Sequence, residues 1–279
     1  MKTVLECLEA GTAYLEGRSI EDARRNMQWL VAHQLGCDRV ELYTQFDRPL
    51  SEEQLIPLRD HLKRRGQGEP LQHLLGTVPF LNREFLCDSR ALIPRPETEE
   101  LAALVMTMEF GRPSRVLDMG TGSGVLGVSL ALELGPDCHE AVLVDRSSEA
   151  LTLARENASR LGSDISFVEG DLFEEVEGLF DLVVANLPYI PEGEKDELSR
   201  EVACDPPAAL FSGPDGMDCL RRFCRDVPPY LRPGALLGLE VGHDQAPPVE
   251  GLLLEAGLTD VHSREDLSGI SRFVFARAR

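Results

Sequence analysis

The feature that most constrains the fold is an alternation of strand-like and helix-like segments from about residue 94 onward. The strand-like run SRVLDM (114–119) precedes a helix-like run at Val125–Leu134, and AVLVD (141–145) precedes another over about residues 148–161. Further strand-like runs follow at 165–170, 180–186, 235–241, 258–263 and 271–277. Segments that alternate in this way predict an α/β fold, in which a mainly parallel sheet carries helices on both faces.

The first 72 residues have a different pattern, with apolar residues at helical spacing. Ala23, Met27 and Leu30 fall on one helical face behind Ser19, which is the expected N-cap. Ser51-Glu52-Glu53-Gln54 fits a capping box before a second apolar face. We therefore expect a small helical bundle at 1–72, and its functional interpretation is a docking domain for a macromolecular substrate.

Residues 73–93 indicate two short strands with a turn near Leu81-Asn82-Arg83. We interpret this stretch as a β-hairpin linker. The predicted domains are thus a helical domain at 1–72, the linker at 73–93, and an α/β domain at 94–279.

Composition and charge exclude several classes of function. The formal net charge is −20, from 48 acidic and 28 basic residues. A broad nucleic-acid surface needs Lys and Arg to neutralise phosphates, so we expect no direct nucleic-acid partner. Seven scattered cysteines without a CxxC pair predict reduced thiols, and the six histidines lack paired-ligand spacing, so no metal is expected.

No apolar run approaches the roughly 18–20 residues that a membrane span requires, and the first apolar segments are interrupted by acids. The chain is therefore expected to be cytoplasmic and without a membrane partner. We also expect it to be monomeric.

The stretch VLDMGTGSGVLG (116–127) combines a strand, a glycine-rich turn and the start of a helix. Gly122, Gly124 and Gly127 satisfy the dinucleotide pattern GxGxxG, which on its own is a weak signal. The fuller pattern places a carboxylate before the turn, where it would oppose a pyrophosphate but suit a ligand with an ammonium and a sulfonium, such as S-adenosylmethionine. The expected cofactor contacts in this stretch are Asp118, Gly120, Thr121, Gly122, Ser123 and Gly124.

Two more acids follow the next strands, and ligands in doubly wound sheets lie at the carboxyl ends of strands. Asp145 is placed to accept hydrogen bonds from ribose hydroxyls, a role common to both classes of nucleotide site. Asp171 is expected to meet the adenine amino group, with Leu172 against the ring. Each acid could instead be a helix cap or a surface charge, although three acidic strand ends in sequence order favour a site.

The fourth strand of the α/β region ends in Asn186-Leu187-Pro188-Tyr189 and should lie next to the first, so that Asn186 also faces the cofactor. This tract resembles the (N/D/S)PP(Y/F) motif of methyltransferases that modify nitrogens conjugated to a π-system. The lone pair of such a nitrogen is delocalised, so the site must orient it. The Asn186 side-chain oxygen and the carbonyl of Leu187 would accept its N–H groups, Pro188 would hold the turn, and Tyr189 would stack on the planar group.

Leu187 departs from the motif, which usually has proline there. Because the expected acceptor is a backbone carbonyl, we predict that activity survives, at a cost of roughly 0.4–1 kcal/mol in preorganisation. Leu187 also precedes Pro188 and is biased toward extended geometry.

Four further segments resemble the release-factor glutamine methyltransferase family (PrmC/HemK). They are EPLQHLLG (69–76), ALIPRPETEEL (91–101), EVACDPPAALFSGPDGMD (201–218) and LEVGHDQA (239–246). The resemblance runs over nearly the whole chain and is most specific at residues 94–98. It implies a Rossmann-like class I S-adenosylmethionine-dependent methyltransferase sheet in the catalytic domain, with Ile93–Glu97 lining the cleft.

The same resemblance implies the substrate, which is the side-chain amide of the glutamine in the Gly-Gly-Gln motif of peptide-chain release factors. S-adenosylhomocysteine would be the second product. Three alternatives stay open: a ribosomal-protein glutamine methyltransferase, a DNA or RNA base amino-methyltransferase, and a cofactor-binding interaction protein that has lost catalysis. The stretch Ile93–Glu97 could also be a rigid Pro-rich linker, with Thr98 as a helix cap. Arg95 has two interpretations, as a cleft residue or as a structural ion-pair partner.

Overall fold

The computed structural model describes residues 2–279, which form two compact units. One unit holds the chain up to Thr77 together with Ser199–Cys204, and the other holds Val78–Leu198 and Asp205–Arg279. The predicted domains differ from these units in two respects. The unit boundary falls inside the predicted linker, and a short segment from the catalytic half belongs to the helical unit.

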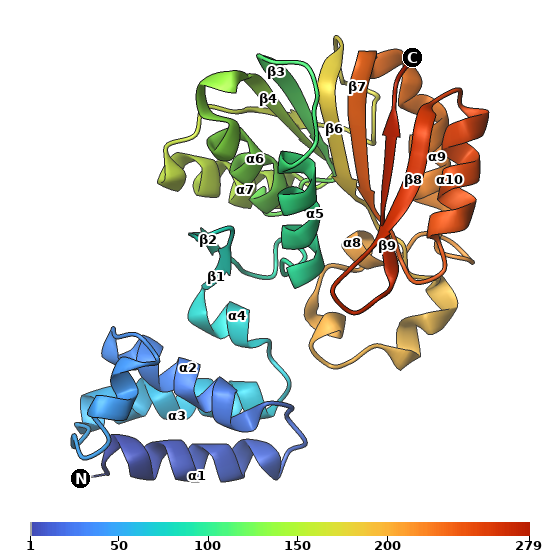
Figure 1. Ribbon diagram of the computed structural model, residues 1–279. Coiled ribbons are helices and arrows are strands. Elements are labelled where there is room, and N and C mark those ends of the chain that lie inside the picture. Colours follow the sequence, from blue (N-terminus) through green and yellow to red (C-terminus); the bar gives the residue numbers. More distant parts are fainter. Residues whose placement is uncertain (1) are drawn as a thin grey trace. The chain divides into compact units, whose positions relative to one another are not determined.

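The first unit is helical, as expected from its apolar spacing (Figure 1). The Ser51–Gln54 capping box is confirmed, with each residue's side chain bonded to the other's backbone N–H. The prediction of Ser19 as an N-cap was wrong. The helix begins at Ala23 behind Asp22, and Ser19 has a left-handed backbone with φ of 57°. The helices are α1 (Val4–Glu16), α2 (Ala23–Leu35), the 3-10 helix η1 (Glu41–Thr44), α3 (Glu52–Gly66) and α4 (Leu71–Leu75).

A buried arginine joins the Ser199–Cys204 segment to this unit. Arg65 is 1% exposed; its Nε donates to Asn26 Oδ1 at 2.7 Å and its Nη1 to the Glu69 carbonyl at 3.1 Å. Its remaining nitrogen forms an ion pair with Glu201, which stands just before the 3-10 helix η4 (Val202–Cys204). A guanidinium taken out of water needs such partners on several sides, so this residue fixes the segment in place.

The second unit contains a seven-stranded sheet in the order β5-β4-β3-β6-β7-β9-β8. The first five of these strands pair in parallel, and β9 pairs antiparallel with both β7 and β8. The predicted neighbours, β3 and β6, are confirmed. The strands are β3 (Ser114–Met119), β4 (Cys138–Asp145), β5 (Ser166–Glu169), β6 (Phe180–Asn186), β7 (Leu231–Glu240), β8 (Thr259–Glu265) and β9 (Ser271–Arg277).

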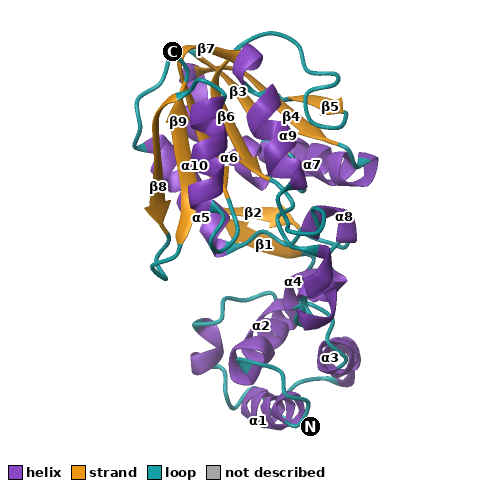
Figure 2. Cartoon of the chain, turned by 90° about the vertical axis from the view of Figure 1, so that its right-hand side faces the viewer, coloured by secondary structure: helices purple, strands orange, loops and turns teal. Residues whose placement is uncertain are grey.

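Helices cover both faces of this sheet, which is the predicted α/β arrangement (Figure 2). Alternate strand residues pack against α5, α6 and α7 on one face and against α9 and α10 on the other. The strand interiors are therefore apolar on both sides, as parallel sheets require. The α-helices are α5 (Pro96–Met106), α6 (Val125–Leu134), α7 (Ser148–Leu161), α8 (Pro207–Leu210), α9 (Asp218–Asp226) and α10 (Ala246–Glu255); the 3-10 helices are η2 (Gly135–Asp137), η3 (Glu192–Glu197) and η5 (Pro228–Tyr230).

The predicted hairpin is present as β1 (Thr77–Phe80) and β2 (Arg83–Leu86), which form a two-stranded sheet. Leu81 and Asn82 join them with φ of 43° and 60°, the paired left-handed conformation of a tight hairpin turn. Across residues 2–279, none of the helices has the length and apolar character needed to cross a membrane.

Candidate active site

A cavity of about 270 Å³ opens at the carboxyl ends of β3, β4 and β6 in the second unit. Parallel strands direct their carboxyl ends to one edge, which is why side chains far apart in sequence meet there. Most of the predicted site residues line it: Asp118, Gly120, Thr121, Gly122, Ser123, Asp145, Asp171, Leu172, Asn186, Leu187 and Pro188. Gly124 and Tyr189 are not among the residues that line it.

The glycine-rich turn that follows β3 forms one wall of the cavity. Gly120 and Gly122 have φ of 73° and 56°, a region where a side chain is strained. The backbone N–H groups of Gly120 and Thr121 both donate to the Val144 carbonyl, at 2.8 and 2.9 Å. Gly124, with φ of 82°, is the residue before α6. The turn is therefore tied to β4 before the helix begins.

Asp118 holds this turn through two hydrogen bonds. Its Oδ2 accepts hydrogen bonds from the Thr121 hydroxyl at 2.6 Å and from the Gly127 N–H at 2.9 Å. Burial raises the pKa of the Asp118 carboxyl to about 6, although both hydrogen bonds act in the opposite direction. A cationic group entering the cavity would favour the ionised form.

Asp145 ends β4 with both carboxylate oxygens oriented by backbone donors. Oδ2 accepts from the Gly122 N–H and Oδ1 from the Ser147 N–H, each at 2.9 Å. Burial raises the pKa of Asp145, and these hydrogen bonds counter the shift. The carboxylate therefore connects the glycine turn to the start of α7 and keeps further lone pairs for a ligand's hydroxyl groups.

Asp171 lines the cavity beyond β5 and forms an ion pair with Arg222 of α9 at 2.8 Å. Leu172 beside it is buried, has a left-handed φ of 56° and is part of the cavity lining. An apolar side chain next to a carboxylate is a suitable surface for one edge and one face of a heterocyclic ring.

Asn186 ends β6 at the same edge, and its side-chain amide is anchored. Its Nδ2 donates to the Thr98 Oγ1 at 3.0 Å, and the Thr98 hydroxyl donates to Glu240 Oε2 at 2.7 Å. Asn186 and Glu240 are register partners at the ends of β6 and β7. Because Thr98 occupies the amide nitrogen, the amide oxygen is the atom left to accept a hydrogen bond from a substrate.

Leu187 fills the space behind the glycine turn. It is 3% exposed, and its Cδ2 would lie 2.8 Å from a Cβ built on Gly120. Leu187 thus packs into the apolar core, while its backbone continues the turn at the cavity wall. The Leu187 side chain thus provides apolar packing where the motif usually has a proline ring.

The Tyr189 carbonyl is held by a buried amide. Gln245 Nε2 donates to it at 2.9 Å, and Gln245 Oε1 accepts from the Gly242 N–H at the same distance. Burial raises the pKa of the Tyr189 phenol to about 12, so the ring is neutral throughout the physiological range.

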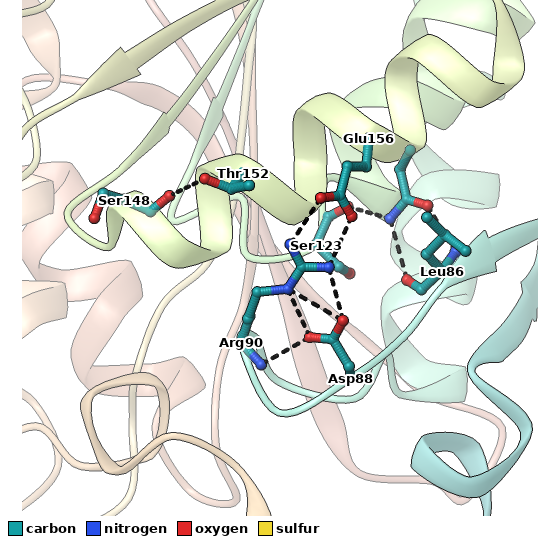
Figure 3. Close-up of polar contacts among 8 residues, drawn as sticks. Leu86, Asp88, Arg90, Ser123, Ser148, Thr152 and Glu156 are labelled. Atoms are coloured by element: carbon teal, nitrogen blue, oxygen red, sulfur yellow. Dashed lines mark hydrogen bonds and ion pairs between the residues drawn. The ribbon is translucent and has the colours of Figure 1, made fainter.

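The segment after the hairpin forms a further part of the cavity wall, and Figure 3 shows the contacts that hold it. Arg90 lies between Asp88 and Glu156 of α7, with 2.7 Å contacts to both carboxylates. Asn157 donates to the Leu86 carbonyl at 3.1 Å and to the Ser123 carbonyl at 2.9 Å. This wall and the glycine turn are therefore anchored to the same helix.

The Pro-rich stretch contributes Pro94, Arg95 and Thr98 to the lining, whereas Ile93 is buried and Glu97 lies outside it. Arg95 forms an ion pair with the buried Asp205, so its structural interpretation holds beside its place in the lining. Thr98 does not cap α5, contrary to expectation. Arg95 is the residue before the helix, without a side-chain cap, and the Thr98 hydroxyl is used by Glu240.

Sequence reasoning missed several residues of this site. Arg90, Arg222 and Glu240 were not predicted, although Glu240 carries the same signal as Asp145, an acid that ends an apolar strand. The other two stand on a loop and a helix face, where charged residues are common and give no local signal.

Comparison with known proteins gives a consistent result over the whole chain. The family described as PrmC N-terminal domain matches residues 6–76, and the methyltransferase domain family matches residues 112–225. A release factor glutamine methyltransferase from Geobacter sulfurreducens is 39% identical over 99% of this chain and 96% of its own length. The chain belongs to the release factor glutamine methyltransferase family. The relatives from Deinococcus radiodurans and Bacillus subtilis are 37% and 33% identical, over 98% and 99% of this chain and 97% and 98% of their own lengths.

Membership of this family confirms the predicted family resemblance and makes the chain a methyltransferase. A 16S rRNA methyltransferase from Thermus thermophilus, in complex with AdoMet and guanosine, has a TM-score of 0.53. It is 20% identical and is matched over 73% of this chain and 50% of that one. A Pyrococcus furiosus methyltransferase has a TM-score of 0.52 at 16% identity, with coverage of 69% and 87%. Both share the α/β fold of the second unit, which confirms the predicted fold class.

Proposed function

We propose that this chain transfers a methyl group from S-adenosylmethionine to the side-chain amide nitrogen of the glutamine in the Gly-Gly-Gln motif of peptide-chain release factors. The observation that carries the proposal is the anchored amide of Asn186, whose nitrogen bonds Thr98 and whose oxygen is left for a substrate. Family membership supports the protein substrate.

The groups that line the cavity suit S-adenosylmethionine. Asp145 presents a carboxylate oriented by two backbone amides, Leu172 offers an apolar face beside Asp171, and Asp118 stands below the turn. These groups match ribose hydroxyls, an adenine ring with its amino group, and a cationic tail. The cofactor, when bound, supplies an electrophilic methyl group on a sulfonium sulfur.

The catalytic work of the chain is orientation. A glutamine amide nitrogen has a delocalised lone pair, and two acceptors that hold its N–H groups favour the pyramidal geometry needed for attack. The Asn186 oxygen and the Leu187 carbonyl take these roles, and Pro188 fixes the turn. Tyr189 is the ring proposed to stack on the amide plane, although it does not line the cavity in this structure. Alignment and preorganised dipoles together lower a barrier by several kcal/mol.

The N-terminal helical unit is the inferred docking domain for the release factor. The net charge of −20 favours a basic protein surface over a nucleic acid as partner. Because release factors act in translation, we infer that the enzyme works in the cytoplasm, and we expect it to act as a monomer.

The test measures labelled methyl transfer from S-adenosylmethionine to a purified release factor. The same factor with its motif glutamine changed to alanine is the control, and duplex DNA, ribosomal RNA and a ribosomal protein run in parallel. Label on the normal factor alone supports the proposal. Label on another acceptor keeps the chemistry and overturns the substrate.

The enzyme variant to compare is Asn186→Ala, which removes both the anchor and the acceptor. We expect turnover to be lost while the dissociation constant of the cofactor changes little. Asn186→Asp is the matched control, because it keeps acceptor oxygens at the same place and should retain part of the activity. Turnover like that of the unchanged enzyme in Asn186→Ala would remove the proposed acceptor role.

A further inference from the structure

Glu240 is a carboxylate that the proposed chemistry does not use, and it is almost completely buried beside the site. It is 1% exposed, at the end of β7 and in register with Asn186 on β6. Thr98, at 5% exposure on the first turn of α5, stands between the two side chains. The three form a chain of hydrogen bonds that ends at the proposed acceptor amide.

The chemistry of these groups decides which of them donates and which accepts in each hydrogen bond. An ionised carboxylate can only accept hydrogen bonds, so the single hydroxyl hydrogen of Thr98 must point to Glu240. The Thr98 oxygen is then free to accept, and the group that can donate to it is the NH₂ of Asn186. The amide is consequently held with its oxygen away from Thr98.

We propose that Glu240 is a positioning residue that acts through Thr98 to fix the amide orientation of Asn186, so that its oxygen faces the substrate nitrogen. This inference rests on the proposed function for its catalytic consequence. When Glu240 is protonated it can donate to Thr98, whose hydroxyl can then donate to the Asn186 oxygen, and the amide turns its NH₂ toward the substrate. A donor in that place repels the substrate's N–H groups.

The surroundings of Glu240 make this reversal accessible near neutral pH. Burial raises the pKa of the Glu240 carboxyl to about 7, whereas the Thr98 hydrogen bond, Arg272 and a weaker direct hydrogen bond from the Asn186 side chain favour its ionised form. The charged and titratable groups that face it are Glu97 of α5, Arg272 of β9 and the Tyr189 phenol. Arg272 is itself engaged by Asp266 at 3.0 Å, so it only partly compensates Glu240.

Thr98→Val is the first test, because it removes the hydroxyl and keeps the shape of the side chain. We expect kcat to fall about tenfold or more, the effect of one lost oriented hydrogen bond in the transition state. The cofactor dissociation constant should stay within about twofold. Thr98→Ser, which keeps the hydroxyl, is the matched control and should restore most of kcat.

Glu240→Gln gives an independent readout, because an amide can point either its oxygen or its NH₂ toward Thr98. The kcat of the unchanged enzyme should rise with pH through an apparent pKa near 7, and this limb should be absent in Glu240→Gln. A Thr98→Val enzyme with kcat within about twofold of normal, or a pH limb that persists in Glu240→Gln, would overturn the inference.

A measurement without turnover separates this inference from the proposed function. In ¹⁵N-asparagine-labelled protein, the side-chain NH₂ resonances of Asn186, identified with Asn186→Asp, should shift between pH 5.5 and 8.5. The shift should disappear in Thr98→Val and in Glu240→Gln. An invariant resonance refutes the relay even if glutamine is methylated, and a titrating one supports it even if the methyl acceptor proves to be another molecule.

Discussion

Gly120→Ala is expected to damage the site through Leu187. Gly120 has φ of 73°, and a Cβ there would lie 2.8 Å from the Leu187 Cδ2, well inside ordinary contact distance. The left-handed backbone costs an alanine about 1–2 kcal/mol, and forcing an extra carbon against a packed side chain costs about 1–3 kcal/mol. The free energy of unfolding should therefore fall by about 2–5 kcal/mol.

A double-mutant cycle with Leu187→Ala separates these two costs. With the leucine removed, Gly120→Ala should lose only the backbone part, so the coupling energy is about 1–3 kcal/mol in favour of the double variant. Gly162→Ala is the matched control. Gly162 has φ of 70° and no other atom within 4 Å of the place that a Cβ would take, so it should show the backbone cost alone in either background.

Urea unfolding followed by circular dichroism gives the free energies. Fluorescence of Trp29, the sole tryptophan, identifies the part of the transition that belongs to the first unit. If the Gly120 and Leu187 substitutions are additive to within about 0.5 kcal/mol, Leu187 does not occupy the space beside Gly120 and the account of the motif's departure from proline is wrong.

Three further perturbations have definite expected results. Asp145→Ala removes a carboxylate held by two backbone amides. Because a hydrogen bond to a charged group contributes about 1.5–3 kcal/mol, calorimetry should find the cofactor dissociation constant raised about 10–100-fold. An unchanged constant would contradict the role of Asp145 in cofactor binding. Glu240→Gln should raise the free energy of unfolding, relative to the unchanged protein, more at pH 8 than at pH 5. In the folded protein the pKa of Glu240 is about 7, above its usual 4.5, so the unchanged protein loses about 3 kcal/mol of stability as the pH rises through this range. Urea midpoints at pH 5 and pH 8 measure the difference. Arg65→Ala should free Ser199–Cys204, and faster trypsin cleavage after Arg200, measured by mass spectrometry, is the result that checks it.

The elements that the sequence predicted best are those with local signals. The helices at Val125–Leu134 and Ser148–Leu161 have the expected bounds, because glycine or serine marks where each begins and apolar spacing continues without interruption. The strand ends at Asp145 and Asn186 were likewise visible as polar residues after apolar runs. The edge of a parallel sheet then brings such residues together with no further information.

What the sequence did not predict depends on contacts between distant residues. The packing of Ser199–Cys204 with the helical unit rests on Arg65, 136 positions away from Glu201, and nothing in either neighbourhood indicates the pair. The role of Thr98 was misassigned for the same reason. Its position after two prolines is typical of a helix cap, yet a carboxylate 142 positions further along the chain takes its hydroxyl.

The burial of Glu240 has a cost that a structural role does not explain. A glutamine of nearly the same shape could bond Thr98 without the penalty of desolvating a charge, and buried ion pairs are often no better than neutral substitutes. Glutamine would, however, leave the direction of the Thr98 hydroxyl undecided, because its amide both donates and accepts. Only an acceptor without hydrogens forces the Asn186 oxygen outward. Burial of the carboxylate thus lowers stability, but it fixes the Asn186 oxygen as the acceptor where the substrate nitrogen must be aligned. Glu240→Gln should therefore make the protein both more stable and less active.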